Sequence, residues 1–282
     1  MGKERVDALL VAKGLASTRE EARRLVMAGL VFAADARLQK PGDKVPEEWE
    51  LTVRGAPHPY ASRGGLKLER ALAEFPVDLR DRVVVDVGAS TGGFTDCALR
   101  AGARAVYAVD VGYGQLAWRL RQDPRVRVME RTNFRFAQRE RFDPPPDAAV
   151  MDVSFISIGK LLPALAGILT PAAPVVALAK PQFEAGPGAV GKGGVVRDPA
   201  VHARVLREVW QAAVGAGFTP LGVTHSPIAG GDGNIEFLLW LEAPGSERPA
   251  AELAAEAVVR AAHDAVGRGA AGRKRDPDRE QG

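Results

Sequence analysis

Short apolar runs alternate with stretches of helical periodicity from residue 60 onward, and this alternation restricts the possible folds more than any other feature of the sequence. Several runs are apolar at almost every position, as strands are when both faces of their sheet are covered. Such strands, alternating with helices, predict an α/β domain with a doubly wound sheet, in which ligands bind at the carboxyl ends of the strands. The expected strands are Val83–Val87, Ala105–Val109, Val126–Met129, Ala148–Met151, Val175–Ala179 and Ile235–Leu241.

The N-terminal part of the chain has a different pattern. Apolar residues at helical spacing predict two short amphipathic helices within residues 4–29, with a break at Gly14. Two short apolar segments follow, around Leu30–Phe32 and Leu51–Val53, and turn-forming residues separate them. We therefore expect a small α+β domain in front of the α/β domain.

These patterns divide the chain into three parts. We predict a small domain with its linker over residues 1–58, the α/β domain over 59–245, and a C-terminal helix with a tail over 246–282. Residues 55–59, which read Gly-Ala-Pro-His-Pro, are the best linker candidate. The residues after Ala265 are rich in Gly, Arg, Asp and Pro, so we expect them to be disordered.

The composition excludes some classes of protein. A hydrophobic fraction of 46% with 26% charged residues excludes a chain that is disordered throughout. The single cysteine, Cys97, cannot form an internal disulfide, and the four histidines show no metal-binding spacing, so we expect a cytoplasmic protein without a structural metal. No signal peptide or membrane span is recognisable. The net charge of +3 is compatible with a polyanionic partner but does not establish one, and nothing in the sequence predicts the oligomeric state.

The segment Val83–Asp96 has the pattern of a nucleoside-binding loop, in which a strand ends in Asp86, a loop of small residues follows, and a helix begins. Glycines in that loop allow a tight turn and the close approach of a ligand to the backbone. Asp110 ends the next strand and could accept hydrogen bonds from both hydroxyls of a ribose.

The spacing of the loop glycines separates the candidate cofactors. NAD would require the pattern G-x-G-x-x-G, with its pyrophosphate on the helix N-terminus. Here Asp86 precedes the loop and would repel a pyrophosphate, but it could hold the ammonium group of S-adenosylmethionine. A second glycine-rich segment, residues 186–193, lacks the Ser or Thr of a phosphate loop, so we do not expect an NTPase. The expected cofactor-binding residues are Asp86, Gly88, Ala89, Ser90, Thr91, Gly92, Gly93, Phe94, Asp110, Val111, Asn133 and Asp152.

Four charged residues form a candidate catalytic set. Asp152, Lys180 and Glu236 lie at or near the ends of expected strands, and Lys67 precedes the first of them. Each alone could be an ordinary solvated or structural residue. In order and context, the four resemble the Lys-Asp-Lys-Glu set of the FtsJ/RrmJ-like ribose 2′-O-methyltransferases. Longer segments of the chain resemble the TlyA-type family, which is also named haemolysin A: Tyr60–Leu68, Asp86–Asp96, Asp152–Ser157, Lys180–Glu184 and Gly193–Asp198.

This resemblance implies a fold, a cofactor and a reaction. It implies a Rossmann-like class I methyltransferase with a seven-stranded sheet, which uses S-adenosylmethionine to methylate the ribose of cytidines in ribosomal RNA, free or in ribosomal subunits. A 2′-hydroxyl must lose its proton as it attacks, and Lys180 is our candidate for the base. Lys67 would favour the neutral form of Lys180 or orient the ribose or a phosphate, Asp152 would orient Lys180, and Glu236 would position one of the lysines. A mechanism that relies on positioning without a base stays open.

The N-terminal segment resembles the RNA-binding fold of ribosomal protein S4. An Asn-Gly turn that this fold usually has is replaced here by Ala33–Ala36, and residues 1–58 hold ten Lys and Arg against nine Asp and Glu. RNA binding would therefore depend on one face rather than on bulk charge. The expected RNA-binding residues are Arg5, Arg19, Arg23, Arg24 and Arg63.

Two other functions compete with this interpretation. The first is a ribosome-associated RNA-binding protein that has kept the fold without catalysis, although all four catalytic candidates are present. The second is a membrane-active haemolysin, which only the historical family name suggests, and the lack of a spanning segment argues against it.

Overall fold

The computed structural model describes residues 2–27, 29–34, 36–53, 58–191, 193–230 and 233–272. The chain forms two compact units, residues 1–63 and 64–282, each with a hydrophobic core of its own. Most of the linker candidate, residues 55–57, and the part of the expected tail beyond residue 272 lie outside the described residues.

The N-terminal unit combines two helices with two small antiparallel sheets. Strand β1 pairs with β4, and β2 lies between β3 and β5. Helix α2 begins where Thr18 Oγ1 accepts a hydrogen bond from the amide of Glu21, which satisfies one of the amides left free at a helix start. The elements are β1 (Lys3–Arg5), α1 (Val6–Ala12), α2 (Arg19–Met27), β2 (Val31–Ala33), β3 (Ala36–Arg37), β4 (Lys44–Pro46) and β5 (Leu51–Val53).

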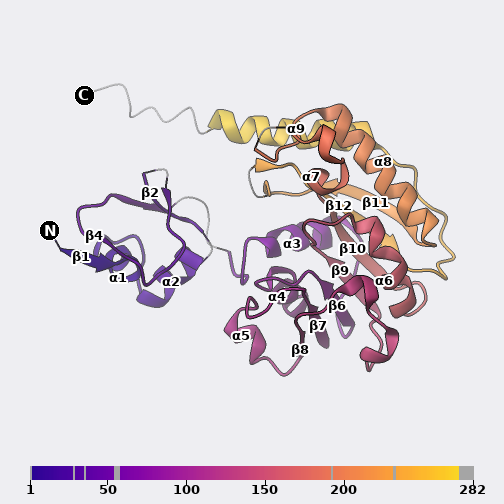
Figure 1. Cartoon of the computed structure of the whole chain (residues 1–282), viewed down its shortest axis with the longest axis horizontal. Helices are drawn as coiled ribbons and strands as arrows, with labels where there is room; N and C mark the ends of the chain where they lie inside the picture. Colours follow the sequence, from indigo (N-terminus) through magenta and orange to yellow (C-terminus); the bar gives the residue numbers. More distant parts are fainter. Residues whose placement is uncertain are drawn as a thin grey trace. The chain divides into compact units, whose positions relative to one another are not determined.

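A seven-stranded sheet in the order β11-β12-β10-β9-β6-β7-β8 forms the centre of the second unit (Figure 1). The strands β10, β9, β6, β7 and β8 are parallel, whereas β12 runs antiparallel to both of its neighbours. The predicted doubly wound α/β fold is confirmed. The strands are β6 (Val83–Val87), β7 (Ala105–Val109), β8 (Val126–Met129), β9 (Ala148–Met151), β10 (Pro174–Ala179), β11 (Thr219–His225) and β12 (Phe237–Glu242).

The edge strand β11 is absent from the six strands that the apolar pattern predicts. Pro220 and Gly222 interrupt its sequence, and the register with β12 shifts between these two residues. Proline is tolerated at a sheet edge because one side of an edge strand needs no hydrogen-bonding partner. The family resemblance implies seven strands, one more than the apolar pattern predicts, but the sequence of β11 gives no sign of where the seventh strand lies.

Helices cover both faces of this sheet. Leu239 and Leu241 of β12 share one hydrophobic cluster with residues of α8 and α9, while Trp240 between them stacks on Phe75, which follows α3. Neighbouring residues of a strand point to opposite faces, so α3 and α8 lie on opposite sides. The helices are α3 (Gly64–Glu74), α4 (Gly93–Arg100), α5 (Trp118–Arg121), α6 (Leu162–Ile168), α7 (Pro181–Glu184), α8 (Pro199–Gly215) and α9 (Ala255–Gly272). Short 3₁₀ turns form at Phe134–Phe136, Arg139–Arg141, Ile158–Lys160 and Pro187–Ala189.

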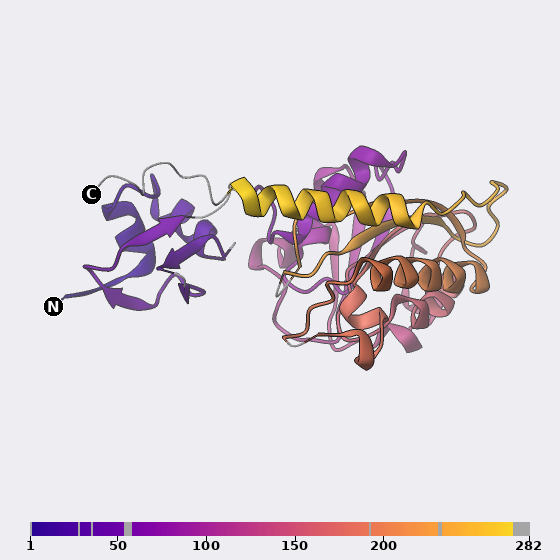
Figure 2. The same cartoon turned by 90° about the horizontal axis from the view of Figure 1, so that it is seen from above.

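The long helix α9 packs against α8 and β11 (Figure 2). It continues to Gly272, beyond Ala265, where we expected disorder to begin. Alanine is the strongest helix former, and alanines at 270 and 271 favour this extension despite the glycines around them. Among the helices that the structure describes, none has the length and apolar character needed to cross a membrane.

A pair of histidines connects α8 with α9. His202 is fully buried, and its Nδ1 lies 3.0 Å from Nε2 of His263. Burial and the neighbouring His263 lower the pKa of His202 to about 4, against weaker opposing effects of the Val196 backbone and Asp198. The folded protein therefore favours the neutral ring. Its contribution to stability is complete above the unfolded pKa of roughly 6.5 and is lost as the pH falls toward the folded value.

We therefore expect acid sensitivity to depend on His202. Between pH 7 and pH 5, protonation of this residue in the unfolded state should lower the free energy of unfolding by about 2 kcal/mol. A His202→Gln variant cannot titrate in this range, so it should lose less. Urea denaturation of both proteins at the two pH values measures the difference, and equal losses would contradict the assignment.

Candidate active site

The four catalytic candidates lie at one edge of the sheet in the second unit. Asp152 follows β9, and Lys180 follows β10, so both stand at the carboxyl ends of parallel strands. Glu236 directly precedes β12, and because β12 is antiparallel to β10, its start meets the end of β10, with Phe237 opposite Ala179. Lys67 comes from the first turn of α3.

Two ammonium groups and two carboxylates alternate in this cluster. Lys67 Nζ lies 2.5 Å from Glu236 Oε2 and 3.7 Å from Asp152 Oδ2. Lys180 Nζ lies 2.5 Å from Asp152 Oδ1 and donates a hydrogen bond of 3.0 Å to Ser154 Oγ. Lys67, Lys180 and Glu236 are all buried. Buried charges are tolerated when they are paired, and the alternation gives each charge a partner of opposite sign.

A cavity of about 470 Å³ lies beside this cluster. Asp152 and Ser154 line the cavity, and both also contact Lys180. A ligand in the cavity would therefore lie next to two side chains that contact this lysine. Of the expected cofactor-binding residues, six line the cavity: Gly88, Ser90, Asp110, Val111, Asn133 and Asp152. The other six are not among its lining residues: Asp86, Ala89, Thr91, Gly92, Gly93 and Phe94.

Backbone amides fix the carboxylate of Asp110 at the cavity. Ser90 N donates to its Oδ2 at 2.8 Å, and Gly112 N donates to its Oδ1 at 2.7 Å. Each oxygen of a carboxylate can accept a further hydrogen bond. The arrangement therefore suits a ligand with two adjacent hydroxyl groups, such as a ribose.

Asp86 has a position that the loop pattern did not predict. It is completely buried at the end of β6 and accepts a hydrogen bond of 2.6 Å from Thr95 Oγ1 of α4. Burial is the main cause that raises the pKa of Asp86 to about 7, with smaller contributions from the Asp152 and Asp110 carboxylates. The role of Asp86 as a cofactor ligand therefore stays a prediction. Asp110 and Asp152 are the two carboxylates that line the cavity.

Gly88 requires the absence of a side chain. Its φ is +87°, and an added Cβ would lie 2.6 Å from the carbonyl oxygen of Asp152. A Gly88→Ala substitution should therefore push the loop away from Asp152. We expect the free energy of unfolding to fall by at least about 1–2 kcal/mol from the left-handed backbone alone, and the Kd for the cofactor expected from the sequence, S-adenosylmethionine, to rise at least about tenfold.

Gly114→Ala is a matched control, because Gly114 also has a positive φ of +72° but an added Cβ would meet no atom within 4 Å. Isothermal titration calorimetry with S-adenosylmethionine compares the two variants. If Gly88→Ala and Gly114→Ala bind S-adenosylmethionine with equal affinity, the close approach of Gly88 to Asp152 is not needed for cofactor binding.

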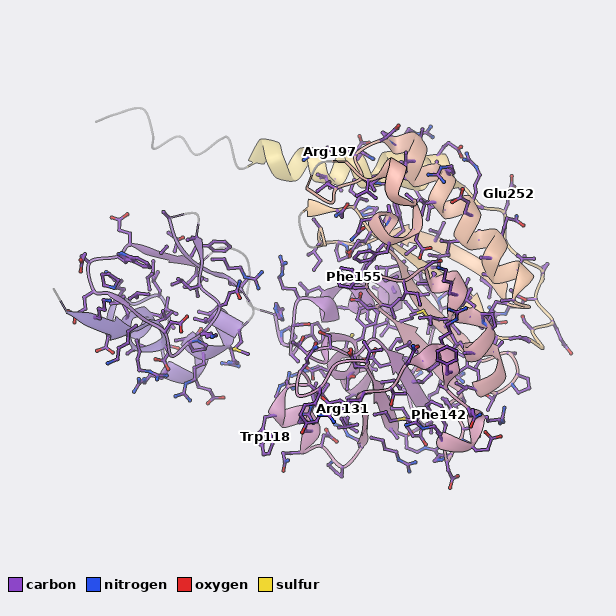
Figure 3. All side chains as sticks on the ribbon, viewed as in Figure 1. Trp118, Arg131, Phe142, Phe155, Arg197 and Glu252 are labelled. Atoms are coloured by element: carbon purple, nitrogen blue, oxygen red, sulfur yellow. The ribbon has the colours of Figure 1, made fainter. Side chains whose placement is uncertain are left out.

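Phe155 was not predicted as a site residue. It is 90% exposed, and its φ of +65° is unusual for a bulky side chain. Phe155, which is labelled in Figure 3, lines the cavity, and its ring centroid lies 5.0 Å from that of Phe183 on α7. Backbone strain of this kind cannot be read from a residue pattern, although Phe155 lies within the segment 152–157 that resembles the TlyA-type family. The other lining residues that we did not predict are Val87, Val109, Gln115, Thr132, Phe134, Val153, Ser154, Ile156 and Leu161.

The expected RNA-binding arginines of the N-terminal unit fall into two groups. Arg5, Arg19 and Arg23 all contact the carboxylate of Asp7. Arg24, on α2, and Arg63 are exposed.

Comparison with known proteins identifies the family. The family model of the FtsJ-like methyltransferases matches residues 60–243, which is more than half of the chain. The chain belongs to the FtsJ-like methyltransferase family. In this FtsJ-like methyltransferase, residues 4–49 match the S4 domain model, so the resemblances to the FtsJ-like methyltransferases and to the S4 fold are confirmed.

Relatives of this FtsJ-like methyltransferase match it over nearly the whole chain. A Bacillus subtilis protein named "Putative rRNA methyltransferase YqxC" is 55% identical over 93% of this chain and 94% of its own. The "16S/23S rRNA (cytidine-2'-O)-methyltransferase TlyA" of Mycobacterium tuberculosis is 45% identical, over 92% of this chain and 97% of its own. A solved structure, "Putative hemolysin from Streptococcus thermophilus", is 50% identical with a TM-score of 0.76, and the match covers 96% of this chain and 99% of that one.

Proposed function

We propose that this FtsJ-like methyltransferase transfers a methyl group from S-adenosylmethionine to the ribose 2′-hydroxyl of a cytidine in ribosomal RNA. The observation that carries the proposal is the position of Asp152, which lines the cavity and pairs with both Lys67 and Lys180. A ligand in the cavity would therefore lie next to a pair of lysines. The substrate class is supported by the names of the Mycobacterium tuberculosis and Bacillus subtilis relatives. We place the reaction in the cytoplasm, on ribosomal RNA or ribosomal subunits.

The residues of the cavity fit S-adenosylmethionine. The cavity has a volume of about 470 Å³, which is within the range of cofactor sites. Asp110 would hold the ribose hydroxyls of the ligand, and Gly88 and Ser90 would allow the ligand to approach the backbone. Asp152 would lie at the polar end of the cavity. When bound, the sulfonium group of S-adenosylmethionine supplies an electrophilic methyl group.

Lys180 would take the proton from the 2′-hydroxyl as this oxygen forms its bond to the methyl carbon, whose bond to the sulfonium sulfur breaks in the same step, so that the sulfur would leave as a neutral thioether. Lys180 must be neutral at that moment, and the ammonium that it becomes lies next to Asp152 Oδ1, which stabilises the positive charge. Glu236 and Asp152 hold Lys67 from two sides, so the Lys67 ammonium is fixed near the hydroxyl or an adjacent phosphate. The carboxylates would thus orient the lysines, while the lysines would contact the RNA.

The exposed aromatic ring of Phe155 favours a nucleoside as the methyl acceptor. Phe155 and Phe183 contact each other, and Lys180 Nζ lies 5.9 Å from the centre of the Phe183 ring. Enzymes that modify RNA often take the target nucleotide out of its stack and hold its base against aromatic side chains. Phe155 could stack on the base of a nucleotide whose ribose is at Lys180.

A labelling experiment tests the proposed function. The purified full chain is incubated with S-adenosylmethionine carrying a labelled methyl group and with unmodified ribosomal RNA or ribosomal subunits. We expect label in the RNA, and we expect mass spectrometry of nuclease digests to locate it in 2′-O-methylcytidine. If no substrate is labelled at low or moderate salt although S-adenosylmethionine binds, the proposal is wrong and a non-catalytic RNA-binding role takes its place.

A further inference from the structure

Asp7 of helix α1 is the centre of a charged cluster in the N-terminal unit. Its side chain is completely buried, yet it contacts three guanidinium groups. Arg5 Nε and Nη2 each donate to Asp7 at 2.9 Å, Arg23 Nε donates at 3.1 Å, and Arg19 Nη2 lies at 3.5 Å. One carboxylate therefore joins arginines from two separate segments of the unit.

The backbone fixes where this carboxylate lies. Asp7 is in the first turn of α1, and its amide donates to the carbonyl of Pro41 at 3.0 Å. The adjacent Val6 is part of the core between α1 and α2. Arg19 and Arg23 are four residues apart on α2, so they lie on one face of that helix. The packing of α1 on α2 therefore brings all three arginines to the same carboxylate.

The cluster presents positive charge to solvent. Three cations against one anion leave a net charge of +2, and the side chains of Arg5, Arg19 and Arg23 are 38%, 57% and 58% exposed. The hydrogen bonds from Arg5, and then from Arg23, hold the pKa of Asp7 far below its usual range. Asp7 is therefore ionised at every pH at which the protein would work.

We propose that Asp7 is a positioning residue that holds Arg5, Arg19 and Arg23 as a preformed site for a phosphodiester of the RNA substrate. This inference rests on the proposed function, and it adds the residue that organises the RNA-binding surface. Arginine side chains are flexible, and ordering them before binding reduces the entropy lost when the RNA binds. A guanidinium has five N–H donors, so each arginine can contact both Asp7 and a phosphate oxygen.

The sign of one mutational effect distinguishes positioning from simple electrostatics. Asp7 carries a negative charge close to the expected phosphate, so bulk electrostatics predicts that Asp7→Asn strengthens RNA binding. If Asp7 orders the arginines, the same substitution weakens binding. We expect the Kd for unmodified ribosomal RNA to rise about tenfold or more, in moderate salt and without S-adenosylmethionine.

Glu20→Gln is the matched control. Glu20 is an exposed carboxylate in the first turn of α2, next in sequence to Arg19. Its neutralisation should leave the Kd for RNA unchanged or lower it slightly. In the methylation assay, Asp7→Asn should raise KM for RNA while kcat and the Kd for S-adenosylmethionine remain those of the wild type. RNA affinity of Asp7→Asn equal to or stronger than that of the wild type would overturn the proposal.

A double-mutant cycle tests whether Asp7 acts through the arginines. Arg23→Gln should weaken RNA binding much less in the Asp7→Asn background than in the wild type. Independent, multiplicative effects would overturn the positioning role. Circular dichroism establishes whether each variant is folded.

A measurement on the wild type keeps the inference testable if Asp7→Asn does not fold. Nitrogen-15 relaxation of the Arg5 and Arg23 Nε atoms should show ordered guanidinium groups before RNA is added, and fast disorder there would overturn the proposal. RNA binding is measured without methyl transfer. A failure of the proposed catalytic function therefore leaves these binding results unchanged, and the two failures can be told apart.

Discussion

Lys180→Ala is expected to lower the rate of methyl transfer to ribosomal RNA by about 10²–10⁴-fold, which is the usual contribution of a general base. Lys180 is not among the residues that line the cavity, so the Kd for S-adenosylmethionine should change little. Single-turnover labelling at saturating RNA measures the rate, and titration calorimetry measures cofactor binding. Lys160→Ala, which removes an exposed lysine of the same unit, is the control and should leave this rate near that of the wild type.

Lys180→Arg separates a base from a positioning group. Arginine keeps the positive charge and can still pair with Asp152, but it does not release its proton near neutral pH, so it cannot accept one. We expect this variant to be as inactive as Lys180→Ala. Substantial activity in Lys180→Arg would instead favour a mechanism in which the side chain only positions the ribose.

Glu236→Ala is expected to lower the free energy of unfolding by about 3–5 kcal/mol, as the loss of one partner of a buried ion pair usually does. Lys67 would keep its buried charge, and the more distant carboxylate of Asp152, at 3.7 Å, would be its remaining ion-pair partner among the described residues. Urea denaturation followed by circular dichroism measures the change.

The partly exposed pair Arg70–Glu74 on α3 provides the control for Glu236. Glu74→Ala should cost no more than about 1 kcal/mol, because exposed ion pairs contribute little. A double variant, Lys67→Met with Glu236→Leu, removes both charges and should be more stable than Glu236→Ala alone. If Glu236→Ala is no more destabilising than Glu74→Ala, the Lys67–Glu236 pair does not stabilise the fold.

The central strands could be predicted from the sequence because burial on both faces makes them apolar at nearly every position. Val83–Val87 and Ala105–Val109 have the predicted bounds, and each lies between two neighbouring strands of the sheet. The edge strand β11 has one neighbour only, so Pro220 and Gly222 are tolerated there and hide the strand pattern. The other edge strand, β8, keeps a mostly apolar sequence, and its predicted bounds Val126–Met129 are those of the structure. Apolar patterning therefore misses a strand where proline and glycine interrupt it, as they do in β11.

The candidate site could be predicted in part for the same reason. Asp152 and Lys180 follow apolar strands directly, so their place at the carboxyl edge follows from the strands themselves. The exposed ring of Phe155 depends on an unusual backbone angle. The cluster around Asp7 depends on how α1 packs on α2, which the spacing of apolar residues does not specify. Contacts set by tertiary packing are the part that sequence reasoning missed.

The antiparallel strand β12 completes the candidate active site only after the other strands of its sheet have been synthesised. Lys67 and Glu236 are 169 residues apart, and Glu236 directly precedes β12, which is the last strand of the sheet in chain order. A nascent chain that still lacks β12 would hold Lys67 without its nearest counter-charge. Assembly of the reactive centre therefore coincides with insertion of a late strand, so a prematurely terminated chain would be both inactive and poorly folded.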